Sequence, residues 1–283
     1  LLLAPVIAAL AAVEAYPLAY TVYLSLFDYQ AGKFVGLTNF SLMLSSSEFW
    51  GAVFTSVLYS TASTALAVIL GVLLALQVST LSRGRAFAES VFLAPLAIAP
   101  VVVGTIWSPG AVWDDFNTFI HFVLGFPFVD VTTYGFFFPT MVVSDAYEWA
   151  PLLMLVSLGI IGGLRGEIYE AAVLHGATTW QVFRRIYLPA IVKSPVFEFV
   201  VVLRFVDAMR AFEIPFTWST WLSFPNAGSP VDTLSLYLFK LFSVPAYGFP
   251  IGLISAVATT LVMVTVIFTA VLYRMLSRTG SVH

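Results

Sequence analysis

The chain has 283 residues, 60% hydrophobic and only 10% charged, with a net charge of −3 and a mean hydropathy of +0.97. This is too little polar surface to cover a water-soluble globule, so the composition predicts a chain that crosses a membrane several times. The absence of cysteine excludes disulfides and thiolate chemistry, and three widely separated histidines predict no metal site and no catalytic centre. The chain begins at Leu1 rather than Met, so we expect further residues before it.

Six apolar stretches are long enough to span a bilayer, which takes about 20 apolar residues. In chain order they are Leu1–Leu26, Phe49–Ser82, Ser90–Trp113, Tyr134–Gly162, Ser194–Pro215 and Gly248–Tyr273. We expect Pro95 and Pro100 to bend the third stretch. Residues 109–135 mix acidic and aromatic side chains and predict an outer loop with a short re-entrant or interfacial helix, and residues 216–247 form the last outer loop.

The distribution of lysine and arginine predicts the orientation, because cytoplasmic loops are enriched in both. The first, third and fifth loops hold only Lys33 and Lys240. The second and fourth loops and the tail hold Arg83, Arg85, Arg165, Arg184, Arg185, Lys193, Arg274 and Arg278. We therefore expect six spans with both termini in the cytoplasm.

The fourth span carries Asp145, Glu148 and Trp149, which lie on one side of a helix because they are three and four positions apart. Carboxylates accept hydrogen bonds from sugar hydroxyls, and an aromatic face covers the apolar side of a sugar ring. A polar cluster that holds helices together is the alternative for each of these residues.

Between the fourth and fifth spans lies a polar stretch, Glu170–Pro189, whose helix start and stop signals predict two short helices. Gly176 can end the first helix at positive φ, and Thr178 with Gln181 has the spacing of a capping box that opens the second. Pro189 forbids further helix in the same register.

This stretch resembles the EAA loop of binding-protein-dependent ABC importer permeases. The pattern of that loop is EAA, three residues, Gly, nine residues and Ile-x-Leu-Pro, and seven residues match it: Glu170, Ala171, Ala172, Gly176, Ile186, Leu188 and Pro189. The resemblance implies that these residues couple the chain to a cytosolic ATPase subunit. An ordinary cytosolic helix pair between two spans is the alternative. We call residues 170–189 the coupling segment.

The fifth span contains Arg204, Asp207, Arg210 and Glu213, three positions apart and alternating in sign, a spacing at which helix neighbours can pair. Each charge inside a bilayer costs about 2.5–3.5 kcal/mol and usually faces the protein interior. We expect Asp207 and Arg210 to form a structural pair; contact of both residues with the substrate is the alternative.

Other segments strengthen the resemblance to the carbohydrate branch of these importers. They are residues 16–40, above all the run Phe34–Phe40; LRFVDAMRAFEIP in the fifth span; and Asn226–Phe242, which resembles an outer loop followed by a helix of the T-L-S-L-Y type. The stretch Trp218–Pro225 is like an insertion. The resemblance implies that the outer loop at Asn226–Phe242 contacts the binding protein or shields a cavity.

The resemblance implies an all-α membrane protein with six transmembrane helices and a cytoplasmic EAA loop, the MetI-like permease fold. Residues 1–48 would form the first span and outer loop, residues 49–276 the permease core with the coupling loop at 163–190, and residues 277–283 a cytoplasmic tail. The implied partners are a second homologous permease, two ATPase subunits, an extracytoplasmic solute-binding protein and the lipid bilayer of a bacterial or archaeal cell membrane.

The implied function is import of a disaccharide or oligosaccharide without covalent chemistry. No phosphate-binding loop motif occurs, so we expect ATP and Mg²⁺ to bind the partner ATPases and no cofactor to bind this chain. Nothing predicts a nucleic-acid partner. A permease for a polyol, a glycerol phosphate or an amino acid is the first alternative. An intramembrane enzyme is the second, which the lack of cysteine and the scarcity of histidine disfavour.

Overall fold

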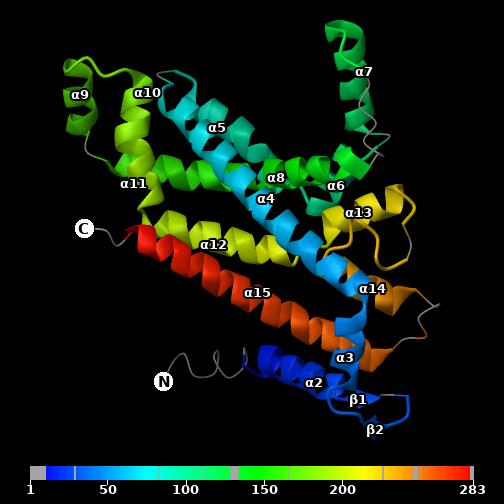
Figure 1. Ribbon diagram of the computed structural model, residues 1–283. Coiled ribbons are helices and arrows are strands. Elements are labelled where there is room, and N and C mark those ends of the chain that lie inside the picture. Colours follow the sequence, from blue (N-terminus) through cyan, green and yellow to red (C-terminus); the bar gives the residue numbers. More distant parts are fainter. Residues whose placement is uncertain are drawn as a thin grey trace. The chain divides into compact units, whose positions relative to one another are not determined.

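The computed structural model describes residues 11–28, 30–81, 83–109, 111–127, 134–164, 166–224, 226–244, 248 and 250–280. These residues are predominantly helical, as Figure 1 shows. The one departure from the expected all-α fold in this part of the chain is a short antiparallel strand pair, β1 (Phe27–Asp28) and β2 (Lys33–Phe34).

The first half of the chain contains η1 (Ala11–Ala15), α2 (Tyr16–Ser25), α3 (Thr38–Ser45), α4 (Ser47–Ser79), α5 (Arg85–Leu93), η2 (Ala94–Ala97), α6 (Pro100–Trp107) and α7 (Val112–Leu124). The second half contains α8 (Tyr134–Gly163), α9 (Gly166–Leu174), α10 (Thr179–Val182), η3 (Phe183–Tyr187), α11 (Leu188–Val192), α12 (Pro195–Met209), α13 (Glu213–Trp221), α14 (Leu234–Ser243) and α15 (Ile251–Gly280).

Three described helices are long and apolar enough to cross a membrane: Ser47–Ser79, Phe136–Gly163 and Ile251–Met275. Two further helix pairs meet this description only if each is one broken span. They are Arg85–Ala97 with Pro100–Trp107, bent by 95°, and Thr179–Val192 with Pro195–Trp221, bent by 68°. The bend expected at Pro95 and Pro100 is therefore confirmed. Of the predicted first span, residues 1–10 lie outside the described residues.

Two predicted spans end earlier than expected. The helix expected to reach Trp113 stops at Trp107, and residues 112–124 form the separate helix α7. The helix expected to reach Pro215 stops at Met209, and α13 begins at Glu213. Pro215 explains the second break, because its ring would clash with the carbonyl of residue 211 and it has no N–H to donate to that carbonyl.

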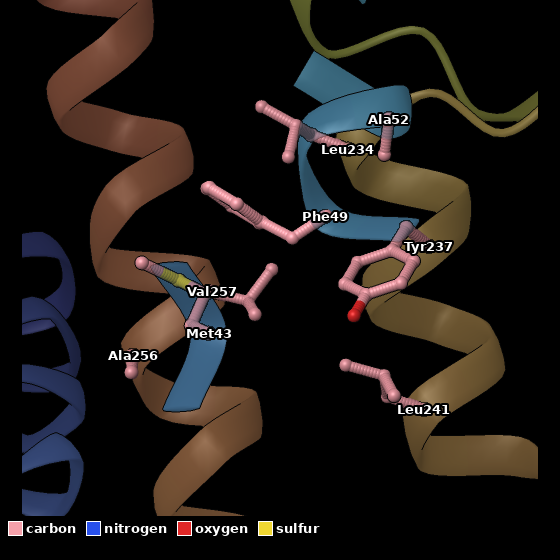
Figure 2. Packing of buried hydrophobic residues seen from close by; sticks show 8 residues of the cluster. All are labelled: Met43, Phe49, Ala52, Leu234, Tyr237, Leu241, Ala256 and Val257. Atoms are coloured by element: carbon pink, nitrogen blue, oxygen red, sulfur yellow. The ribbon is translucent and has the colours of Figure 1, made fainter. Parts of the chain in front are cut away.

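The chain forms two compact units, each described here by itself: Leu1–Val57 with Arg210–Ile267, and Leu58–Met209 with Phe268–His283. The core of the first unit joins residues of α3, α4, α14 and α15. Figure 2 shows Phe49 between α15, which carries Val257, and α14, which carries Tyr237. The Phe49 and Tyr237 rings meet edge to face at 6.5 Å, an arrangement that aromatic quadrupoles favour.

The Phe34–Phe40 run has a structural role in the first unit. Asn39 donates its side-chain amide to the carbonyls of Ser25 at 2.8 Å and Phe27 at 3.0 Å. A Cβ placed on Gly252 would lie 2.3 Å from the Phe27 carbonyl oxygen, so only glycine fits there. This run therefore holds the end of α2 against the start of α15.

The second unit is built on close packing between α4 and α8. A Cβ on Gly71 would lie 2.6 Å from Cβ of Leu153 and 2.8 Å from the carbonyl oxygen of Ala150. Substitution of Gly71 would thus force the two helices apart. The core of this unit also includes Ile191, Phe197 and Val201, which join α11 and α12 to the same packing.

Candidate functional site

A buried arginine, Arg204, lies at the centre of a polar cluster in the second unit. Only 1% of its side chain is exposed, and it contacts groups from three helices. Its Nη2 donates to a carboxylate oxygen of Asp145 on α8 and, at 3.0 Å, to Oγ of Ser63 on α4. Its Nη1 donates to Oδ2 of Asp207, one turn further along α12, at 3.0 Å. One guanidinium therefore joins α4, α8 and α12.

The predicted face of α8 forms part of this cluster. The guanidinium carbon of Arg204 lies 4.8 Å from the ring centroid of Trp149, within cation–π range. Asp145 and Glu148 are both buried, and both lie within electrostatic range of the hydroxyl of the fully buried Tyr59. The structure thus brings together the predicted residues Asp145, Glu148, Trp149 and Asp207, and we call these residues with Arg204 and Ser63 the polar cluster.

The predicted ladder of charges along one helix is confirmed only for its first pair, Arg204 and Asp207, because α12 ends at Met209, before Arg210. Asp207 pairs with Arg204 in the same helix, and its side chain is 42% exposed. Arg210 belongs to the first unit, where its carbonyl accepts a hydrogen bond from Oγ of Ser235 at 3.1 Å. The pairing of Asp207 with Arg210 stays a prediction.

Sequence reasoning recognised the charges but missed the central position of Arg204 and the whole contribution of Ser63. The pattern of alternating charges pointed to neighbours on the same helix. Asp145 is 59 positions away from Arg204 in the sequence, and Ser63 is 141 positions away. One feature of the sequence could have identified Arg204 as the central residue. It is the only basic residue in α4, α8 and α12, so the buried carboxylates of these helices have no other cation to pair with.

The coupling segment has the predicted helix boundaries. Gly176 has φ +81°, its N–H donates to the carbonyl of Val173 at 2.9 Å, and the N–H of Ala177 donates to that of Ala172 at 3.0 Å. These two bonds form a Schellman motif, which ends α9. No heavy atom lies within 4 Å of a Cβ placed on Gly176, so the backbone angle, and not space, requires glycine.

The predicted capping box at the start of α10 is present in full. The Gln181 backbone N–H donates to Oγ1 of Thr178 at 3.3 Å, and the Thr178 N–H donates to Oε1 of Gln181 at 2.8 Å. Helix continues from Thr179 to Val192, because a π turn at Phe183–Tyr187 changes the register before Pro189. Pro189 therefore starts α11 rather than ending the helical segment.

The seven matched residues divide into two groups. Glu170, Ala171 and Gly176 are exposed and Ala172 is half-buried, all in or just after α9. Ile186, Leu188 and Pro189 are half-buried beside Phe183 and Ile191, which belong to the core of the second unit. The tip of the segment carries large exposed apolar side chains, with Leu174 87% exposed and Trp180 57% exposed. The coupling segment thus has an anchored base and an exposed apolar tip.

The segment before α14 in the first unit, predicted as the last outer loop, contains a second buried ion pair. Asp232 is fully buried and accepts from Nζ of Lys240 at 2.7 Å and from the backbone N–H groups of Gly228 at 2.8 Å and Ser229 at 3.0 Å. Burial lowers the pKa of the Lys240 ammonium, although its hydrogen bond to Asp232 acts in the opposite direction. Thr233 accepts a hydrogen bond from the N–H of Leu236 and begins α14, the helix that the T-L-S-L-Y pattern predicts.

Among the described residues, no group of three or more histidine, aspartate or glutamate side chains could hold a metal ion. Within the polar cluster, Asp145 and Asp207 both pair with Arg204. The arrangement provides hydrogen-bonding groups inside a helical bundle and an exposed tip on an anchored helix pair.

No family model matches the chain. The trehalose/maltose transport system permease protein MalF of Thermococcus litoralis is 30% identical over 219 residues, which cover 76% of this chain and 72% of that protein. The probable ABC transporter permease protein y4oQ of Sinorhizobium fredii is 29% identical over 288 residues, which cover 99% of this chain and 90% of that protein.

Two crystal structures share the fold. One is a bacterial ABC transporter involved in the import of the acidic polysaccharide alginate, with a TM-score of 0.78 at 22% identity over 98% of this chain and 94% of that chain. The other is the bacterial alginate ABC transporter in complex with an alginate pentasaccharide-bound periplasmic protein, with a TM-score of 0.80 over 99% and 94% of the two chains. Together with the relatives above, they show that this chain belongs to the family of sugar ABC transporter permeases.

Proposed function

We propose that this chain is one of two homologous permeases of an ATP-driven importer that carries a disaccharide or oligosaccharide. A solute-binding protein delivers the sugar outside the cell, two ATPase subunits bind ATP and Mg²⁺, and the sugar crosses between the two permeases. The chain adopts six spans with both termini in the cytoplasm of a bacterium or archaeon, an arrangement supported by the eight-to-two distribution of basic residues.

The observation that carries this proposal is the geometry of the coupling segment. A membrane subunit can use the energy of ATP binding only through a rigid contact with the ATPase. The coupling segment supplies an anchored base, with Phe183 4% exposed and Ile191 fully buried. Its tip is turned by Gly176 and exposes Leu174, an apolar side chain suited to a groove on a partner.

The substrate class is supported by the relatives. One is named for trehalose and maltose, and another is a probable permease for starch degradation products, 25% identical over 248 residues. The sn-glycerol-3-phosphate transport system permease protein UgpA of Escherichia coli is 24% identical over 250 residues. A glycerol phosphate is therefore the second candidate substrate. In our proposal, Asp145, Glu148, Trp149 and Asp207 face the path of the solute, and Arg204 positions them.

The experiment is ATP hydrolysis and sugar uptake by the complete transporter in proteoliposomes, with and without its binding protein. Gly176→Pro removes the donor of one Schellman bond and cannot adopt φ +81°, so we expect loss of uptake and loss of the ATPase from the purified complex. The permease itself should still insert in the membrane.

The matched control is Thr179→Pro, three positions away. Thr179 is the first residue of α10, a position that tolerates proline, and Thr178 before it is already extended with ψ 158°. This variant should keep uptake and ATPase binding. Normal uptake and ATPase co-purification in Gly176→Pro would contradict the proposed role of the coupling segment.

A further inference from the structure

The interior of the second unit has an excess of carboxylates. Within Leu58–Met209, the helices α4, α8 and α12 carry five charged residues in all: Asp145, Glu148, Glu198, Arg204 and Asp207. Four are acidic and one is basic. Asp145 is 5%, Glu148 is 6% and Arg204 is 1% exposed, so three of these groups have little water to screen their charges.

The single cation of the polar cluster is already engaged. One side of the Arg204 guanidinium bonds to Asp145 and Ser63, the other side bonds to Asp207, and Trp149 covers a face. An anionic solute could reach this cation only by displacing a carboxylate. Because Asp145 and Asp207 together outnumber the one positive charge, the cluster repels an approaching anion.

We infer that the polar cluster selects for uncharged saccharides and against acidic ones, with Asp207 as the specificity-determining residue that a solute can reach. This inference rests on the proposed function, in which the cluster faces the solute path. Asp207 is the carboxylate of the cluster with substantial exposure, 42% of its side chain, whereas Asp145 and Glu148 are 5% and 6% exposed. Like charges brought together at a binding surface suppress the wrong partner.

A neutral sugar suits the same groups. Its hydroxyls can donate to carboxylate oxygens, which are acceptors only. The Nε–H of Arg204 is buried and has no acceptor among the described residues, so the cluster keeps one unsatisfied donor beside the exposed Asp207. The fold is shared with an importer of an acidic polysaccharide, so this selectivity comes from side chains and not from the helical arrangement.

The experiment measures saccharide binding to the complete transporter, purified without its binding protein so that this protein's own specificity does not contribute. The probes are matched trisaccharides: maltotriose, cellotriose and xylotriose as neutral compounds, and trimannuronate and trigalacturonate as acidic ones. Titration calorimetry should show a neutral probe binding at least about tenfold more tightly than either acidic probe. Raising the salt concentration should narrow this difference.

The variant that tests the mechanism is Asp207→Asn, which keeps the shape of the side chain and removes its charge. We expect the preference for neutral probes to fall by at least about threefold, whereas Asp115→Asn, the same change at an exposed position on α7, should leave it unchanged. Equal or tighter binding of acidic probes, or an unchanged preference in Asp207→Asn, overturns the inference and leaves sugar import intact. Binding of no saccharide overturns the inference, and uptake of a neutral sugar by the same transporter with its binding protein then tests the proposed function separately.

Discussion

The coupling segment and the polar cluster carry different parts of the proposed function, and they are built in opposite ways. The coupling segment lies within 20 consecutive residues, depends on backbone geometry at Gly176 and Thr178, and exposes its tip. The polar cluster joins three helices far apart in the sequence and buries a guanidinium almost completely. A surface that must meet another protein can be specified by neighbouring residues, whereas a set of paired buried charges needs the assembled bundle.

The largest effect should come from removing the cation of the polar cluster. Arg204→Met leaves the buried carboxylate of Asp145 without its counter-ion, and breaking a buried ion pair in this way costs about 3–5 kcal/mol. We expect a strong loss of assembled complex, measured by size-exclusion chromatography and thermal unfolding in detergent. The double variant Arg204→Met with Asp145→Leu removes both charges and should recover part of this loss. A single variant as stable as the native chain would contradict a structural role for the Arg204–Asp145 ion pair.

A smaller effect on assembly should distinguish the roles of Asp145 and Asp207, the two carboxylates that bind Arg204. Asp145 is almost fully buried and Asp207 is 42% exposed, so Asp145→Asn should reduce assembly and Asp207→Asn should leave it nearly unchanged while altering uptake. Complex yield and uptake of the same preparations distinguish these outcomes. Equal losses of assembly in both variants would show that Asp207 is structural, as the sequence first suggested for its pairing with Arg210.

The sequence predicts the parts of this fold that depend on nearby residues. Uncharged runs locate α4 and α15, a long apolar run locates α8, Pro95 and Pro100 locate a bend, and the capping residues locate the end of α9 and the start of α10. Two predicted span ends were wrong, because α6 stops at Trp107 and α12 stops at Met209. Pro215 acts on the residue four positions before it, so α12 ends earlier than the proline itself. At Pro189 the prediction holds, because a π turn changes the helix register before the proline.

The candidate site was predicted only in part. Asp145, Glu148 and Trp149 share a helix face by spacing alone, and this face is confirmed as part of the polar cluster. The bonds from Arg204 to Asp145 and Ser63 cannot be read from spacing, because they depend on how α4 and α8 approach each other at Gly71. Contacts of this kind follow from packing and become visible only in the structure.

The smallest effect should come from the capping box of the coupling segment. Thr178→Ala removes the oxygen that accepts the Gln181 N–H, a loss of about 1 kcal/mol for a helix cap. Because the base of the segment is also held by Phe183 and Ile191, we expect the complex to assemble and uptake to fall only modestly. Hydrogen exchange should show faster opening of residues 179–182 with no change in α8. Complete loss of uptake would show that the capping residue itself contacts the ATPase.

The central claim, that the exposed tip of the coupling segment binds the ATPase, has a direct measurement because the chain contains no cysteine of its own. Leu174→Cys places a single reactive thiol at an 87% exposed position on the tip, and Phe119→Cys on α7 is a matched control at a 56% exposed position outside the segment. With a short thiol–amine crosslinker and the assembled transporter in membranes, the account predicts a crosslink between position 174 and the ATPase subunit and none from position 119. Absence of that crosslink in a complex that still imports sugar, or equal crosslinking from both positions, would contradict it.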